Sequence, residues 1–217
     1  MAHRADALRG QRAGDPPLRL IRTPGRPSGS AHSQARVPNA VIGMLVFLGA
    51  EAMFFAGLVS AYMVLRAGSE VWPPLDQPRL PVVVTAVNTV VLLCSGYTMW
   101  RARRTARQGL RPALTRWLVA TAGLGGIFLA VQGSEWIRLV SYGLVVSSGI
   151  YGATFYTLIG CHGLHVLGGL VVLLFVLRGA TRGRYTARNH TPVIVCQFYW
   201  FFVVGVWPIL YLLVYVL

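Results

Sequence analysis

The chain has 217 residues, of which 55% are hydrophobic, and its mean hydropathy of +0.58 excludes an ordinary soluble domain. Its formal net charge is +14, and all 20 basic residues are arginines. Because these arginines flank hydrophobic runs, we interpret the charge as the positive-inside pattern of a membrane protein and expect no nucleic-acid partner.

The first 37 residues are rich in Arg, Pro, Gly and Ser and lack the apolar core of a secretory signal. Four prolines before residue 30 would break the amphipathic helix of a mitochondrial transit peptide. We therefore predict that residues 1–37 form a disordered, basic tail on the cytoplasmic side of the membrane.

Five apolar spans follow in residues 38–217, each long enough to cross a hydrocarbon core of about 30 Å as a helix. Their residues are continuously apolar, which favours an all-α bundle over a β-barrel. The tail and the loops after the second and fourth spans hold most of the arginines, which predicts a cytoplasmic N-terminus and an external C-terminus. We place the spans at about residues 38–65, 81–100, 114–132, 145–177 and 192–217.

The first span carries Glu51 near its middle. Placing a carboxyl at the bilayer centre costs about 3 kcal/mol or more of insertion free energy, so such a residue indicates a structural or functional role. We consider two interpretations: a neutral carboxyl hydrogen-bonded to a neighbouring helix, or a group that accepts protons or contacts lipid. In the second span, we expect Asn88 to hydrogen-bond between helices.

The third span ends near Glu135, which we expect at the rim of the membrane, paired with Arg138. In the fourth span His162 and His165 are three residues apart, so they lie on roughly one face of a helix. That spacing is compatible with a metal or haem ligand pair, or with hydrogen bonds to Glu51 or other polar groups across a helix interface. Because no third or fourth ligand is evident, we favour hydrogen bonding and expect no metal site.

Glycines in the same span predict close helix–helix contacts, because a missing side chain lets two backbones approach. The residues in question are Gly160, Gly163 and Gly168.

Several segments taken together resemble the subunit III family of cytochrome c oxidase, one of the haem–copper oxidases. They extend over nearly all of residues 38–217, and the glycine–histidine segment of the fourth span is the most specific of them. The segments are Glu51-Ala52-Met53-Phe54-Phe55-Ala56, Trp72-Pro73-Pro74, Asn88-Thr89 with Ser95-Gly96, Gln132-Gly133-Ser134-Glu135-Trp136, Gly160-Cys161-His162-Gly163-Leu164-His165-Val166, and Tyr199-Trp200 with Trp207.

The last segment departs from the family pattern, because Phe201 and Val204 stand where the family has histidine and aspartate. Five spans rather than seven are similar to the short bacterial form of the family. The resemblance implies that Glu51 corresponds to the family's carbodiimide-reactive carboxyl. It also implies a chain that binds neither haem nor copper itself.

The resemblance further implies a non-redox subunit of a proton-pumping terminal oxidase in the bacterial plasma membrane. It would pack on the haem- and copper-carrying catalytic subunit I among other oxidase subunits, hold structural phospholipid, and support proton uptake and stability. We expect Glu51, His162, His165 and Glu135 to form its polar interior. Lipid-binding candidates are Arg101, Arg178 and Trp72.

Three alternatives remain open from the sequence. A subunit III-like accessory protein of a nitric oxide reductase would share these motifs. A stand-alone haem-binding membrane protein would use His162 and His165 as ligands. A small transporter would show matching halves, and five spans do not divide in that way.

Overall fold

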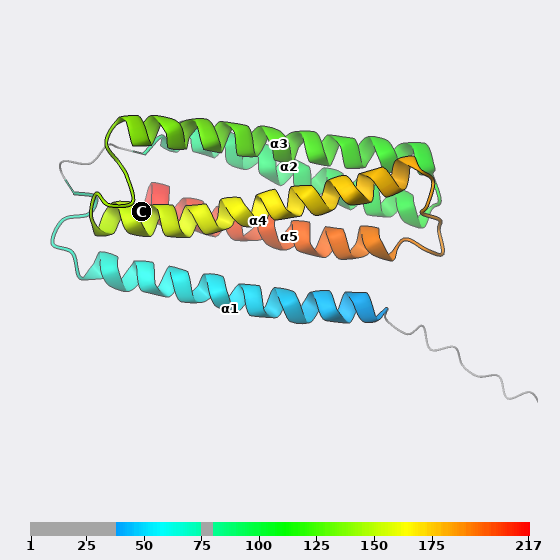
Figure 1. Cartoon of the computed structure of the whole chain (residues 1–217), viewed down its shortest axis with the longest axis horizontal. Coiled ribbons are helices and arrows are strands. Elements are labelled where there is room, and N and C mark those ends of the chain that lie inside the picture. Colours follow the sequence, from blue (N-terminus) through cyan, green and yellow to red (C-terminus); the bar gives the residue numbers. More distant parts are fainter. Residues whose placement is uncertain (1–37, 75–79) are drawn as a thin grey trace, which may run out of the picture. The chain divides into compact units, whose positions relative to one another are not determined.

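The computed structural model describes residues 38–74 and 80–217 (Figure 1). This part of the chain contains helices and no strand. The predicted tail, residues 1–37, lies outside the described residues. The five long helices are α1 (Asn39–Ala67), α2 (Val82–Arg107), α3 (Arg111–Ser141), α4 (Ile150–Thr181) and α5 (Thr191–Tyr211), and α5 is followed by a short π-helix, η1 (Leu212–Val216).

All five long helices are long and apolar enough to cross a membrane, which confirms the predicted all-α architecture with five spans. Two of them extend well beyond the predicted spans: α2 continues to Arg107, and α3 runs from Arg111 to Ser141. The prediction counted only apolar residues, whereas arginine and alanine are strong helix formers and continue the helices past the apolar region.

The fourth helix begins later than predicted, at Ile150 rather than near residue 145. Gly149 has a φ of 109°, a backbone conformation that ends any helix before it and that glycine adopts without strain. Just upstream, the Ser148 hydroxyl donates to the Val145 carbonyl at 2.7 Å and accepts from the Val145 amide at 3.2 Å. This local turn competes with helix over residues 145–148.

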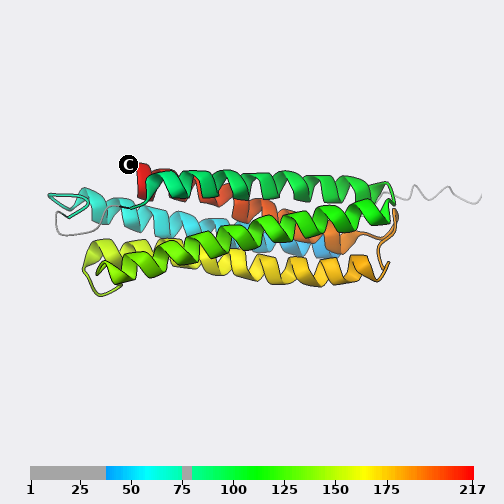
Figure 2. The same cartoon turned by 90° about the horizontal axis from the view of Figure 1, so that it is seen from above.

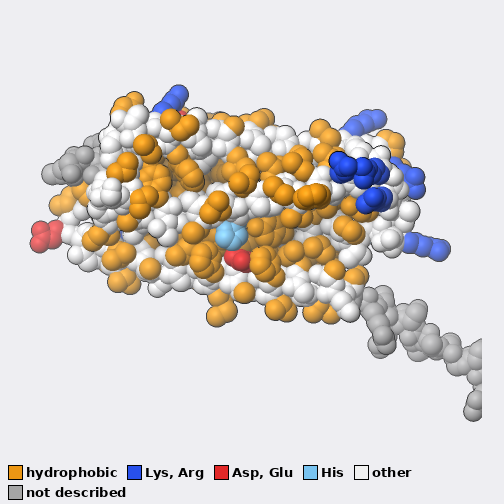
Figure 3. All heavy atoms as spheres, viewed as in Figure 1, with side chains coloured by type: hydrophobic (Ala, Val, Ile, Leu, Met, Phe, Trp, Pro, Cys, Tyr) orange, Lys and Arg blue, Asp and Glu red, His pale blue; other side chains and the backbone are white. Residues whose placement is uncertain are grey.

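Helices α2 to α5 form a four-helix bundle in which α2 packs on α3, α3 on α4, α4 on α5, and α5 on α2. Helix α1 lies outside this bundle, and its main contacts are with α5 and α4 (Figure 1). Seen from above, the helices run side by side along one long axis (Figure 2). The α2–α3 and α4–α5 connections lie at the same end, where the arginine side chains gather (Figure 3).

Hydrogen bonds between helices fix the register of the bundle. The fully buried indoles of Trp200 and Trp207 on α5 donate to the hydroxyls of Ser95 (3.0 Å) and Thr89 (2.8 Å) on α2. The buried amide of Asn88 donates to the Phe128 carbonyl on α3 at 3.1 Å, so this side chain joins two helices. Such bonds help hold transmembrane helices together where hydrophobic burial does not.

Two adjacent glycines on α3 allow a matched test of this packing. A Cβ added at Gly125 would lie 2.7 Å from the Trp200 ring, whereas one added at Gly126 would have nothing within 4 Å. We expect Gly125→Ala to lower the free energy of unfolding by about 1–3 kcal/mol, because the buried indole cannot move aside. The control Gly126→Ala should change it by less than about 0.5 kcal/mol. Denaturant titration of the purified complex measures both; equal effects would contradict this account.

Candidate functional site

The centre of the candidate site is a contact between Glu51 on α1 and His165 on α4. The Glu51 Oε2 atom lies 2.8 Å from the His165 Nε2 atom. Both residues sit near the middle of their helices, and each side chain keeps 19% of its surface exposed. The pair therefore links α1 to the bundle at about mid-membrane depth. In Figure 3 a histidine and an acidic side chain are visible together in the middle of a largely hydrophobic face.

The number of protons in this pair follows from its hydrogen bonds. The second ring nitrogen of His165, Nδ1, lies 2.7 Å from the Cys161 carbonyl oxygen. A carbonyl only accepts, so Nδ1 carries a hydrogen. One further proton then lies between Nε2 and Glu51, either on the carboxyl or on the ring. In both arrangements the pair has no net charge, which explains how it is tolerated among apolar side chains.

Aromatic side chains surround the pair. The rings of Phe54 and Phe55 lie 6.1 Å and 5.0 Å from the His165 ring, centroid to centroid. The Tyr199 hydroxyl on α5 donates to the His165 backbone carbonyl at 3.1 Å. Three helices, α1, α4 and α5, therefore position one imidazole. In the sequence Phe54, Phe55 and Tyr199 stand out only as members of longer family segments, and nothing in their spacing indicates contact with His165.

The two histidines do not share one environment, although they are three residues apart. His162 is 1% exposed, and its ring stacks on Trp207 at a centroid distance of 4.9 Å. The edges of Phe55 and Phe128 face it. Within the described residues neither of its ring nitrogens has a hydrogen-bond partner. Of the two predicted imidazoles, the structure therefore brings only His165 to Glu51.

Glu135 does not join this pair. Its carboxylate accepts from Arg138 on the same helix at 3.0 Å, which agrees with the expected partner. Of the two expectations for Glu135, the membrane rim and the polar interior, its burial agrees with the interior. The helix places Glu135 toward the inside of the bundle, while the Arg138 side chain stays 67% exposed.

The glycines of α4 also differ from one another. A Cβ added at Gly163 would meet the Trp136 ring at 3.1 Å, and one at Gly168 would meet the Tyr199 hydroxyl at 3.7 Å. At Gly160 there is nothing within 4 Å, so the expected close contact is not present there. Gly160 instead lines a hollow between α3 and α4.

Two of the lipid-binding candidates, Arg101 and Trp72, lie at opposite ends of the bundle. The guanidinium of Arg101 stands over the Trp117 ring, 4.6 Å from its centroid, and donates to the Tyr97 hydroxyl. Trp72 lies beyond the other end of α1, edge-on between Tyr62 and Tyr151. The structure therefore does not bring these candidates together.

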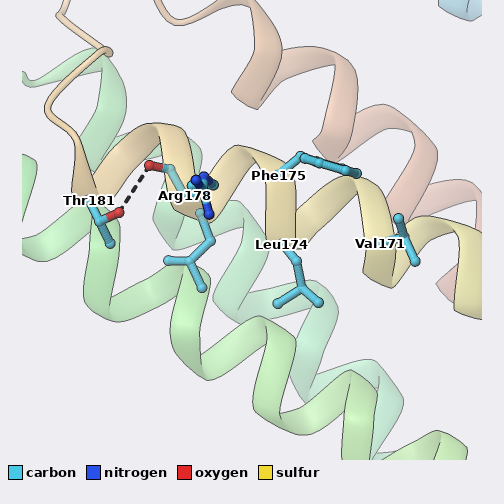
Figure 4. Close-up of a pocket in the computed structure, with 6 residues that line it drawn as sticks. Val171, Leu174, Phe175, Arg178 and Thr181 are labelled. Carbon is cyan, nitrogen blue, oxygen red and sulfur yellow. Dashed lines mark hydrogen bonds between the residues drawn. The ribbon is translucent and has the colours of Figure 1, made fainter.

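Arg178 is placed differently, beside a shallow hollow of about 460 Å³ along α4 (Figure 4). Within the described residues no carboxylate pairs with its guanidinium. The side chains that line the hollow are Val171, Leu174, Phe175, Leu177, Arg178 and Thr181. An apolar groove that ends at an unpaired cation has the chemistry of an anionic lipid site.

No group of three or more His, Cys, Asp or Glu side chains in residues 38–74 and 80–217 is arranged to hold a metal ion. The candidate site is a carboxyl–imidazole pair that joins α1 and α4.

A sequence model of the family described as cytochrome c oxidase subunit III matches residues 23–217 of this chain. The chain is 37% identical over 191 residues to "Cytochrome c oxidase subunit 3" of Synechocystis sp., covering 87% of this chain and 81% of that protein. It is 39% identical over 186 residues to "Probable cytochrome c oxidase subunit 3" of Mycobacterium leprae, with 85% and 91% covered. A third relative, "Cytochrome c oxidase subunit 3" of Thermostichus vulcanus, is 34% identical over 187 residues, with 86% and 91% covered.

Proposed function

Because this chain belongs to the cytochrome c oxidase subunit III family, we propose that it is the non-redox subunit of a bacterial terminal oxidase. Membership of the family makes it a multi-pass membrane component of a cytochrome oxidase complex. In the proposal, it packs on the haem- and copper-carrying catalytic subunit, holds structural phospholipid, and sustains proton uptake and stability during oxygen reduction.

The observation that carries this proposal is the Glu51–His165 contact. One proton lies between a carboxyl and an imidazole, and its transfer from one to the other leaves the net charge of the pair unchanged. Within such a pair the proton moves between the carboxyl and the imidazole at membrane depth without creating an unpaired charge, which hydrocarbon penalises strongly. It also fastens α1 to α4. These properties support a role in proton transfer and in holding the helices together, rather than in the reduction of oxygen.

The orientation in the proposal follows from the arginines. Ten arginines lie in the α4–α5 connection or in the helix ends beside the α2–α3 and α4–α5 connections, and these two connections meet at one end of the bundle. Loops rich in arginine stay on the cytoplasmic side. We therefore place this end and the tail, residues 1–37, in the cytoplasm, and η1 on the outer side of the bacterial plasma membrane.

We expect Arg178→Gln to reduce the anionic phospholipid that co-purifies with the complex. One surface arginine contributes about 1 kcal/mol to the binding of anionic lipid, so the affinity should fall about fivefold. Arg138→Gln is the matched control, because it removes one arginine at the other end of the bundle and should leave the lipid content unchanged. Mass spectrometry of lipids retained in mild detergent measures both; equal retention in the two variants would remove Arg178 from the proposal.

The proposed function is tested by purifying a tagged copy of the chain in mild detergent. Recovery of a multi-span subunit with a-type haem, copper and oxygen consumption is the expected result. Recovery with a partner that reduces nitric oxide would replace the oxidase assignment. A Soret band on the isolated 217-residue chain would overturn it and make His162 and His165 haem ligands.

A further inference from the structure

A second polar site lies apart from the Glu51–His165 pair, in a hollow of about 250 Å³ between α3 and α4. His162 lines it on the inner side, and Gln132 and Trp136 line it from α3. Leu164 and Leu167, which are 68% and 49% exposed, lie at its outer side. The hollow therefore reaches from the middle of the bundle to the surface of the helices that faces lipid.

Three buried nitrogens on side chains that line this hollow lack a hydrogen-bond partner within residues 38–74 and 80–217: both ring nitrogens of His162 and the indole nitrogen of Trp136. An uncharged imidazole presents one N–H donor and one acceptor nitrogen, and an indole presents one donor. Leaving a buried donor or acceptor unpaired costs about 1–3 kcal/mol each. One hydroxyl can accept from one of the two donors and donate to the acceptor nitrogen of His162, whereas a ketone or ester can only accept.

The remaining walls of the hollow are apolar and aromatic. The rings of Phe128 and Trp207 and the side chains of Leu129 and Ile159 line it together with Gly160 and Gly163. Its volume is several times the roughly 30 Å³ that one water molecule occupies in the liquid. Aromatic walls favour an aromatic ring, which gains from offset or edge-on packing.

The depth of the site restricts the occupant further. His162 lies about 18 Å along α4 from Ile150, at a rise of about 1.5 Å per residue. This places it near the centre of the membrane, beyond the reach of phospholipid headgroups. A molecule that arrives from the lipid side and brings a hydroxyl to this depth must itself dissolve in the hydrocarbon core.

We propose that the α3–α4 hollow binds a lipid-soluble phenol or quinol, whose hydroxyl hydrogen-bonds His162 and whose ring packs on Phe128, Trp136 and Trp207. Its alkyl part would leave the bundle past Leu164 and Leu167. This site is independent of the Glu51–His165 pair and of the proposed oxidase function, because it rests on a different imidazole and a different helix interface.

The test uses the purified complex in phosphatidylcholine nanodiscs and two photoreactive probes. One is a 4-alkylphenol with a diazirine in its alkyl chain, and the other is its methyl ether, which cannot donate a hydrogen bond. Cross-links are mapped by mass spectrometry to residues 128–136 and 159–167. We expect at least tenfold more labelling of these segments by the phenol than by the ether.

Gly160→Leu and Gly126→Leu are the matched variants, because both glycines are half-buried and neither has an atom within 4 Å of an added Cβ. Only Gly160 lines the hollow. Gly160→Leu should lower phenol labelling at least tenfold and Gly126→Leu by less than twofold, while His162→Phe should reduce it to the level of the ether. Equal labelling by the two probes, or undiminished labelling of Gly160→Leu, overturns the proposal. Absence of labelling in the unaltered complex also overturns it and leaves water as the partner of His162.

Discussion

Replacing His165 by leucine should lower the free energy of unfolding of the chain by about 3 kcal/mol, and removing Glu51 as well should restore most of that loss. The single substitution leaves the Glu51 carboxyl among apolar side chains without its imidazole partner, which is 2.8 Å away in the structure. In Glu51→Leu/His165→Leu both polar groups are gone, and the site becomes an apolar contact. Such replacements of whole pairs are often close to neutral.

The two single variants differ in the group that they leave behind. Glu51→Leu leaves an imidazole that still donates from Nδ1 to the Cys161 carbonyl, so we expect a smaller loss, of about 1–2 kcal/mol. Reversible denaturant titration of the purified complex gives all four free energies of a double-mutant cycle. Additive effects, with the double variant as unstable as the sum of the singles, would show that the two side chains do not interact.

Replacing Trp200 by alanine should lower the free energy of unfolding by about 3–5 kcal/mol. This indole is fully buried and packs on Gly125 of α3. It also donates to the Ser95 hydroxyl on α2, so three helices lose contacts together. Trp200→Phe keeps most of the packing and should lose about 1–2 kcal/mol, mainly from the missing hydrogen bond.

Trp100 provides the control for this prediction, because its side chain is 43% exposed. Trp100→Ala should change the free energy of unfolding by less than about 1 kcal/mol. The three variants are ranked by their midpoints of thermal denaturation in mild detergent. Denaturation is monitored by the release of the chain from the complex. A loss for Trp100→Ala as large as that for Trp200→Ala would show that the midpoint does not report on the bundle core.

The five helices were predictable because each one must present about 20 apolar residues to the bilayer, and this requirement is visible in composition alone. The helix ends were less predictable. Residues 101–107 are mostly polar and still helical, whereas residues 145–148 begin with two valines, at the start of a predicted span, and form a turn closed by Ser148. Hydropathy indicates whether a residue lies in lipid or in water. The residue at which a helix begins or ends depends instead on local hydrogen bonds and on glycine conformation.

The candidate site was predictable in its members but only partly in its contacts. A separation of three residues leaves two side chains about 60° apart around a helix, and this angle decides that His165 meets α1 while His162 faces the bundle core. The choice depends on where α1 lies, and a loop of more than ten residues leaves α1 free to pack on α4 and α5 rather than on its neighbour α2. For the same reason Gly160 could not be distinguished from Gly163, which contacts Trp136.

The outside position of α1 has a consequence for how the protein is made. This helix leaves the ribosome before the other four, yet its main contacts are with α4 and α5, which are synthesised last. During that interval Glu51 has no imidazole to bind. The mean hydropathy of 2.1 in the most apolar part of α1 is what holds the helix in the bilayer alone. We therefore expect a stage of biogenesis in which α1 is inserted but lacks its contacts with α4 and α5 until these helices emerge.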